Sequence, residues 1–336
     1  MPAQRARANV SRPPLASPET TVLEEAAERG SRRIALSLLA AVRDARDRLD
    51  DPADKTALHD FRVKLRRLRS WLRAFRPLFR DTVRGKIERR LARIADVTGA
   101  SRDLEVHIKW VKRANRALPE SGQPGATWLL HRLRASKRDA DAKLRGNLDR
   151  YFSKTMRRAE RALERYEARV ADDGLRFGEV AAELIARQAA ELREAGQRVS
   201  ERGDRAEAHA ARIATKRFRY TLEGLGSVGV NIASIVDELE RLQDTLGELH
   251  DAQQFGGELS TMISLLVSER ASRASDNRRA RDARSGRARA AIGLRMLLKR
   301  LRRAEARSFE TFLASRNADW ATPHWERLDA VAKSLR

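Results

Sequence analysis

The chain has 336 residues, of which 41% are hydrophobic and 35% are charged, and its 70 lysines and arginines against 47 acids give a net charge of +23. It has no cysteine, which excludes disulfides, thiolate zinc sites and cysteine nucleophiles, and no apolar run approaches the roughly 20 residues of a membrane span. Because so large a cationic surplus repels itself, it predicts an anionic partner: a nucleic acid, an acidic membrane surface or a polyphosphorylated molecule.

Residues 1–17 are basic, contain several Pro and Ala and lack an apolar centre, so we expect a disordered tail there. From residue 18 onwards the periodicity is helical, with breaks at clusters of Gly, Pro, Ser and Asp, which predicts an all-α protein. Gly99 is expected to end one helix, and Ser101 and Asp103 to start the next. The expected helical segments are 20–50, 54–79, 82–98, 101–118, 126–170, 175–200, 205–224, 232–249, 250–271, 276–316 and 324–335.

Residues 58–75, LHDFRVKLRRLRSWLRAF, carry two rows of side chains on one predicted helix. Apolar residues recur every three or four positions, which predicts the face that packs into the core. This apolar row is Leu58, Phe61, Leu65, Leu68, Leu72 and Phe75. A second row, made of cationic residues and a histidine, has the same spacing but begins one residue later, so it lies about 100° further around the helix than the apolar row. This cationic row is His59, Arg62, Arg66, Arg69 and Arg73. Since it borders a groove between helices, we predict that it binds an anion.

Two blocks of the first half recur in the second half. Residues 208–225 repeat the pattern of 58–75, with His209, Arg212, Lys216 and Arg219 in the places of His59, Arg62, Arg66 and Arg69. Residues 239–252 repeat 91–104, so that Asp244 and Asp251 match Asp96 and Asp103. Matched blocks in the same order predict a tandem duplication with repeats at 18–172 and 173–336. Each repeat is expected to be an antiparallel bundle of about four helices.

The repeated motifs are H-x-x-R-[VI]-x-x-[KR]-R-x-R and L-x-x-[LI]-x-D-x-x-G-x-x-x-D, and in them the chain resembles the CHAD family (conserved histidine α-helical domain). The likeness covers about residues 28–335, including the closing Pro323-His324-Trp325. It implies two four-helix bundles related by a pseudo-twofold axis, and binding of inorganic polyphosphate, in some members on polyphosphate granules. Many members carry an N-terminal CYTH-type domain, but this chain shows no E-x-E-x-K strand and resembles a stand-alone CHAD domain.

The resemblance also implies which residues contact the ligand. They are His59, Arg62, Arg66, Arg69, His209, Arg212, Lys216 and Arg219. Neighbouring cations are secondary candidates, namely Lys64, Arg67, Arg102 and Arg217. The second motif helix is less basic than the first, since Glu223 replaces Arg73. A bound phosphate favours imidazolium, so we expect His59 and His209 to tighten binding modestly below neutral pH.

The repeated carboxylates have a structural interpretation and a chemical one. We expect Asp96, Asp103, Asp244 and Asp251 to position Arg62 and Arg212 or to cap helix starts, in preference to binding a metal or acting as bases. The sequence has no glycine-rich phosphate loop, nucleophile motif or His–carboxylate cluster with metal-ligand spacing. We therefore predict no metal, no cofactor and no catalysis.

The leading prediction is a polyphosphate-binding module in the cytoplasm or on polyphosphate granules, without membrane association. A nucleic-acid-binding protein fits the net charge equally well. Aromatic side chains for stacking bases are sparse, however, and no nucleic-acid-binding motif occurs. An enzyme that acts on polyphosphate is the third alternative. The sequence does not determine the oligomeric state.

Overall fold

A computed structural model describes residues 21–51, 53–54, 56–79, 82–83, 85–165, 174–200, 204–272, 278–319 and 322–336. Over these residues the chain is helical, apart from turns and one isolated β-bridge between Ala26 and Arg176. The prediction of an all-α protein is confirmed. The expected tail at 1–17 lies outside the described residues. In the described part, none of the helices combines the length and the apolar character needed to cross a membrane.

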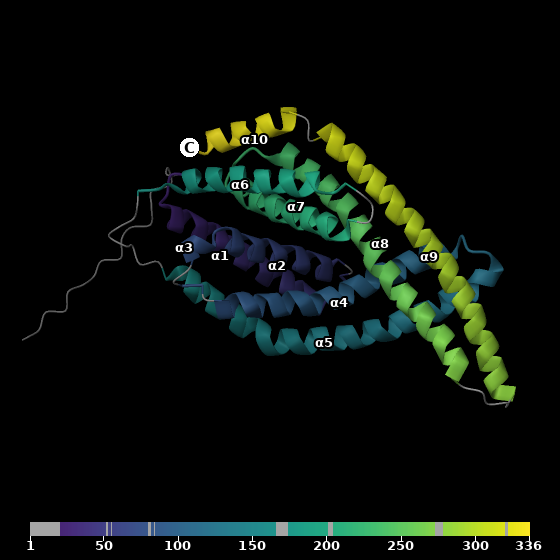
Figure 1. The fold of residues 1–336 in the computed structure, drawn as a ribbon. Coiled ribbons are helices and arrows are strands. Elements are labelled where there is room, and N and C mark those ends of the chain that lie inside the picture. The colour runs from purple at the N-terminus through teal and green to yellow at the C-terminus, as the bar shows by residue number, and fades with distance from the viewer. Residues whose placement is uncertain are drawn as a thin grey trace, which may run out of the picture.

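Figure 1 shows the helices in chain order, and each half contains two consecutive long helices. The first half contains α1 (Ala27–Asp47), η1 (Arg48–Asp50), α2 (Ala57–Ala74), α3 (Arg76–Phe79), α4 (Gly85–Asn115), η2 (Glu120–Gly122) and α5 (Gln123–Glu164). The second half contains α6 (Phe177–Gln197), α7 (Arg205–Gly226), α8 (Ala233–Ser272), α9 (Arg278–Asp319) and α10 (Thr322–Ser334). The long helices α4 and α5 pack against each other, as do α8 and α9.

The predicted helix breaks near residues 99 and 249 are wrong. Helix α4 runs without interruption through Gly99, and α8 runs through Gly247 and His250. Gly99 lies inside the helix beside Arg62, and a Cβ atom there would lie 3.4 Å from Nη1 of Arg62, which is an ordinary van der Waals contact. Asp103 and Asp251 consequently lie inside long helices, so they do not cap helix starts.

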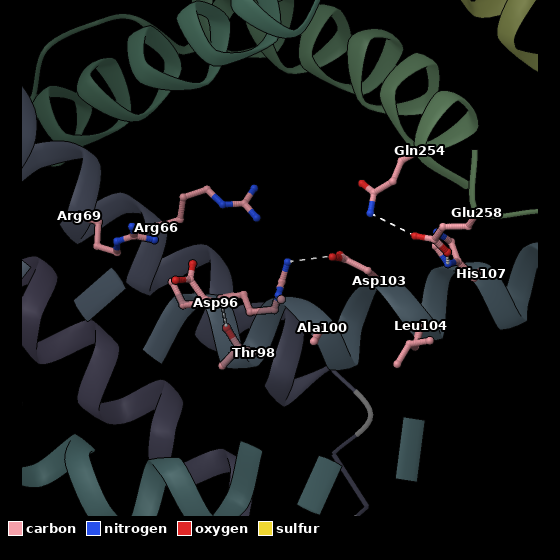
Figure 2. A pocket seen from close by; sticks show the side chains of 13 residues that line it. Arg66, Arg69, Asp96, Thr98, Ala100, Asp103, Leu104, His107, Gln254 and Glu258 are labelled. Carbon is pink, nitrogen blue, oxygen red and sulfur yellow. Dashed lines mark hydrogen bonds and ion pairs between the residues drawn. The ribbon is translucent and has the colours of Figure 1, made fainter. Parts of the chain in front are cut away.

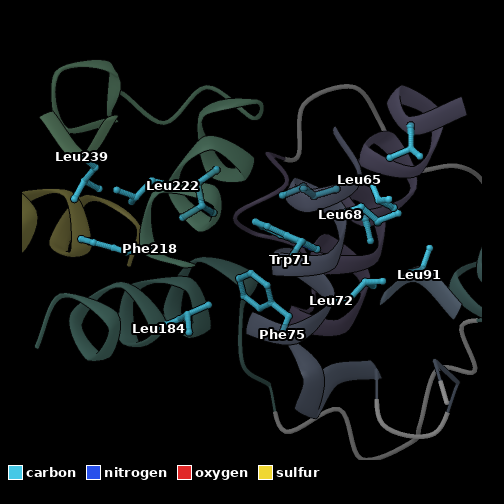
Figure 3. Close-up of a cluster of buried hydrophobic side chains, with 14 of the residues drawn as sticks. Leu65, Leu68, Trp71, Leu72, Phe75, Leu91, Leu184, Phe218, Leu222 and Leu239 are labelled. Atoms are coloured by element: carbon cyan, nitrogen blue, oxygen red, sulfur yellow. The ribbon is translucent and has the colours of Figure 1, made fainter. Parts of the chain in front are cut away.

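The main core contains residues from both halves. Five members of the apolar row of α2 are buried, and Leu58 is partly buried and packs against the core, which confirms the predicted packing face. Figure 3 shows side chains of α2 in one cluster with side chains of the second half. Helices α2 and α7 approach closely where they cross, because a Cβ atom on Gly224 would lie 2.4 Å from the Trp71 ring. The Trp71 indole also donates a 2.9 Å hydrogen bond to the carbonyl oxygen of Ser31 on α1.

A second apolar cluster joins the far ends of the four long helices. It contains residues of α4 and α5 from the first half, and of α8 and α9 from the second half. Helices α5 and α9 meet there backbone to backbone, since a Cβ atom on Gly125 would lie 2.6 Å from the Cα atom of Gly293. Each of the four long helices thus contributes residues to both clusters, the main core and this second cluster. Three members of the cationic row of α2, Arg62, Arg66 and Arg69, line a cavity whose other lining residues come from α4 and α8 (Figure 2).

Candidate anion-binding site

A cavity of about 590 Å³ lies beside the cationic row of α2. Arg62, Arg66 and Arg69 line it from α2. Helix α4 contributes the segment from Ala95 to His107, and α8 contributes Gln254 and Glu258. Figure 2 shows Arg66 and Arg69 at one end of the cavity, and His107, Gln254 and Glu258 at the other end. The displacement of the cationic row from the apolar row by one residue thus places three guanidinium groups at the cavity wall, while the apolar row packs in the core.

Arg62 is partly buried against α4, where its guanidinium group lies beside Gly99. Its Nη2 atom lies 3.9 Å from a carboxylate oxygen of Asp103, which is mostly exposed. Its Nη1 atom is buried and has no hydrogen-bond partner. Burial, and secondarily the nearby charge of Arg66, lowers the pKa of Arg62 to about 10. Arg62 is thus a desolvated cation whose hydrogen-bonding capacity is not fully used.

Arg212 and Lys216 of α7, from the second half, do not line the cavity, but both are within electrostatic range of Arg66. The Nε atom of Arg212 is buried without a hydrogen-bond partner, as is Nη1 of the equivalent residue Arg62. Burial lowers the pKa of Arg212. Burial, followed by the charges of Arg66 and Arg212, lowers the pKa of Lys216 to about 7. We call Arg62, Arg66, Arg212 and Lys216 the central cations.

Arg66 connects the two halves within this group. Its Nη1 atom donates a 3.1 Å hydrogen bond to the hydroxyl oxygen of Tyr220 on α7. The Tyr220 side chain is almost fully buried, so the hydroxyl group is fixed in place by the core. Tyr220 therefore holds Arg66 at the cavity without neutralising its charge. Sequence analysis did not single out Tyr220, although it follows directly after the second motif.

The carboxylates near the central cations do not cancel their charge. Asp251 lies near Arg212 and Lys216, and its own pKa is raised, primarily by burial. Asp103 reaches Arg62 only at the 3.9 Å separation given above. The expectation that these two residues position Arg62 and Arg212 is compatible with this arrangement. Asp96 lines the cavity near Arg69. Asp244 instead lies near Glu240 and Arg219, where burial raises its pKa.

Arg219 requires a correction, because its surroundings do not leave it available to a ligand. The residue is only 6% exposed. Its Nη1 atom lies 3.0 Å from Glu223 and 2.9 Å from Glu240, and its Nε atom donates to Gln243. These acids neutralise Arg219 and fix it between α7 and α8. The replacement of Arg73 by Glu223 in the second copy was the sequence signal for this difference.

The other predicted residues are distributed around the cavity with unequal access to it. Arg69 lines the cavity, and its pKa is lowered, primarily by burial. Arg73, His59 and His209 are exposed and do not line it. The ring of His209 lies 5.1 Å from that of His250. None of these three exposed residues is positioned by the core in the way that Arg62 and Arg66 are.

The secondary candidates are not part of the cavity wall. Arg67 forms an ion pair with Glu223 across the contact between α2 and α7. Arg102 lies 2.8 Å from Glu105 of the same helix. Arg217 is exposed and Lys64 is partly buried. Arg67 and Arg102 thus have acidic partners within the protein, which reduces their contribution to an anion site.

His107 lines the far end of the cavity and packs on the buried Phe255 of α8, and sequence analysis missed both. Their rings stack with centroids 4.0 Å apart, and Nδ1 of His107 lies 3.8 Å from Glu258. Burial lowers the pKa of His107. The offset of 148 residues that relates 91–104 to 239–252 also relates 107 to 255, so extending the repeat by three residues would have paired these positions. No group of three or more His, Cys, Asp or Glu in the described part could hold a metal ion.

The chain is similar in sequence to a known protein family and similar in fold to solved structures. A sequence model of the CHAD domain matches residues 33–260 of the chain. The crystal structure of the CHAD domain from the plant Ricinus communis has 18% sequence identity and a TM-score of 0.54, with 94% of each chain covered. PptA from Streptomyces chartreusis has 14% identity and a TM-score of 0.56, over 86% of this chain and 98% of that one. At these identities the structural likeness establishes the fold alone. No curated protein matches the sequence.

Proposed function

The chain belongs to the CHAD domain family, and from this premise we propose that it binds linear inorganic polyphosphate in the cavity beside α2. The observation that carries the proposal is the incomplete hydrogen bonding of two arginines, Arg62 and Arg212, which occupy equivalent positions in the sequence repeat. Arg62 and Arg212 each have a buried nitrogen atom with no hydrogen-bond partner among the described residues. A buried charged group without its hydrogen bonds is costly. A ligand that supplies anionic oxygen atoms would satisfy these nitrogens, and phosphate groups do so.

The binding mechanism follows from the types of side chain present. Arginine donates paired hydrogen bonds to phosphate oxygens, so three of the four central cations suit a chain of phosphates. The ligand also relieves the repulsion among the central cations. As basic groups replace the condensed counterions of the polyanion, these ions are released into solution. Recognition therefore depends on the charge density and the phosphate geometry of the ligand, and it involves no contacts with nucleic-acid bases. We propose binding without chemical conversion of the ligand.

The finer architecture is part of the proposal. We propose that the halves are duplicated four-helix units related by a pseudo-twofold axis. Positions that the sequence repeat equates meet each other at the cavity: Asp103 and Asp251 lie within electrostatic range, and His107 stacks on Phe255. Equivalent residues can contact each other only close to such an axis. The cavity would then lie on the axis, with cations from both halves near it. Association with polyphosphate granules in the cytoplasm would follow from the binding activity.

A salt series tests the proposed function. We expect labelled long-chain polyphosphate to bind the full chain at low salt, with log Kd rising linearly with log salt concentration between about 50 and 500 mM. Fluorescence anisotropy measures this, and RNA of equal phosphate concentration serves as the competitor. Absence of binding at low salt would contradict the proposal. Displacement of polyphosphate by an equal phosphate concentration of RNA would favour the nucleic-acid alternative.

A pH series provides a second prediction. Lys216 has a pKa of about 7 in the free protein, and a bound polyanion must raise it by stabilising the ammonium form. Well below pH 7 the amine is already protonated, so the affinity does not change with pH through Lys216. Above pH 7 binding requires uptake of a proton, and the affinity falls by up to about tenfold per pH unit until the pKa of the complex is reached. Anisotropy titrations between about pH 6 and 9 measure this effect.

Two variants assign this pH dependence to a side chain. Lys216→Arg keeps the charge at all of these pH values and is expected to flatten the profile. His59→Ala combined with His209→Ala is expected to leave the profile unchanged, because both histidines are exposed and do not line the cavity. If the histidine variant flattens the profile and Lys216→Arg does not, the original sequence-based hypothesis about the histidines is correct.

A further inference from the structure

Lys216 has surroundings that are unusual for a lysine. It is partly buried on α7, one helical turn after Arg212 and one turn before Tyr220. It forms no hydrogen bond or ion pair with any other described residue. Arg212 lies one turn before it on α7, and Arg66 of α2 reaches the next turn of α7, where its Nη1 atom donates a 3.1 Å hydrogen bond to Tyr220. Arg62 of α2 and His250 and Asp251 of α8 lie within electrostatic range of the amine. Three guanidinium groups against one carboxylate leave the amine in a strongly positive environment.

This environment favours the uncharged form of the amine. Burial and the neighbouring arginines lower the pKa of Lys216 to about 7, so about half of the molecules carry a neutral amine at neutral pH. A neutral amine is nucleophilic, whereas an ammonium group is not. Lysines beside other cationic groups are activated in this way in covalent catalysis. The same arginines attract small anions to the amine.

We propose that Lys216 is an acylation site that reacts directly with small acyl phosphates. The surrounding arginines hold the phosphate group of the reagent, and the amine nitrogen attacks the carbonyl carbon. A C–N bond forms and the bond between the carbonyl carbon and the phosphate oxygen breaks. Inorganic phosphate leaves with the bonding electron pair, the nitrogen loses one proton to water, and an amide remains on Lys216. No oxidant, reductant or further cofactor is required.

The choice of an acyl phosphate follows from the chemistry of the cluster. The reagent needs an electrophilic carbonyl group for the amine and an anionic group for the arginines, and an acyl phosphate carries both. Arginine forks match phosphate oxygens and also stabilise the charge that develops on the leaving phosphate. An uncharged acylating reagent offers the amine a carbonyl group but offers the arginines nothing to hold.

Acylation has a consequence for ligand binding, and this part rests on the proposed function. The amide carries no charge, so acylation removes one of the central cations and weakens polyphosphate binding. Conversely, bound polyphosphate covers the amine and raises its pKa, so it protects Lys216 from acylation. The reaction itself does not depend on polyphosphate binding.

The test is acetylation of the full chain with acetyl phosphate near neutral pH, followed site by site with peptide mass spectrometry. Lys143 and Lys154 on α5 are exposed and serve as internal references. We expect Lys216 to be acetylated at least about tenfold faster than either of them. Excess inorganic phosphate is expected to slow the reaction at Lys216 and not at the references. An uncharged acetyl ester is expected to show a smaller preference for Lys216.

Two results would overturn the inference. The first is acetylation of Lys216 no faster than that of Lys143 and Lys154, which would show that the amine is not activated. The second is a rate at Lys216 that inorganic phosphate does not change, which would show that the arginines do not hold the reagent. Protection by long-chain polyphosphate is measured in a separate arm. If Lys216 reacts fast but polyphosphate neither binds nor protects, the proposed function fails while the acylation site stands.

Discussion

Replacing all four central cations with glutamine is expected to weaken polyphosphate binding by at least about 100-fold. A hydrogen bond to a charged group contributes about 1.5–3 kcal/mol. Because about 1.4 kcal/mol corresponds to tenfold in Kd, the loss of only two such contacts accounts for this change. The slope of log Kd against log salt concentration should also become shallower, since fewer counterions are released. Anisotropy at fixed salt concentration measures the first effect, and the salt series measures the second.

A matched variant separates the site from the overall charge. Arg134, Arg138, Arg145 and Arg157 are exposed on α5 and do not line the cavity. Changing these four to glutamine lowers the formal net charge by the same amount, and we expect Kd to rise severalfold at most. Equal losses in the two variants would show that only the net charge matters and that the cavity is not the binding site.

The fold should survive loss of the central cations. The apolar row of α2 is unchanged in this variant, and the repulsion among the partly buried cations is removed. We therefore expect a melting temperature equal to or above that of the natural chain. If the variant unfolds, its loss of binding says nothing about the site, and the single change Arg66→Gln then tests the cavity, with an expected loss of about tenfold.

Changing Trp71 to alanine is expected to lower the free energy of unfolding by about 3–5 kcal/mol. Trp71 is fully buried, its ring centroid lies 4.4 Å from that of Phe75 in a tilted arrangement, and it packs directly against Gly224. The change leaves a cavity at the crossing of α2 and α7. It also leaves the carbonyl oxygen of Ser31 without the indole donor. Urea or guanidinium unfolding, followed by circular dichroism, measures the loss.

The control for this prediction is an exposed apolar residue. Leu265 on α8 is 55% exposed, and Leu265→Ala is expected to change the free energy of unfolding by about 0.5 kcal/mol or less. Because the main core contains residues from both halves, Trp71→Ala should shift one common unfolding transition. Two separate transitions, of which only one shifts, would show that the halves unfold independently and that the shared core does not couple them.

The sequence predicted the helical class and the packing of α2 correctly because both depend on local periodicity. Five of the six apolar positions are buried and the sixth is partly buried, since a row spaced by three and four residues has one possible orientation on a helix beside a core. The predicted helix breaks at Gly99 and near Gly247 were wrong because the end of a helix also depends on tertiary packing, which local periodicity does not show. Glycine is a local signal for a helix end, but α4 and α8 continue through these positions because tertiary packing along the long helices overrides the local preference.

A cationic helical protein with repeated basic helices can be predicted from the amino-acid sequence, because composition, periodicity and internal repeats are visible without coordinates. Which of the cations are available to a ligand depends on how the helices pack. Arg212 and Arg219 lie seven residues apart on α7, yet the first has an unpaired buried nitrogen, whereas the second is neutralised by Glu223 and Glu240. The charge that a side chain presents to a ligand depends on its burial and on the acids that other helices bring to it, and these are set when α2, α4, α7 and α8 pack together.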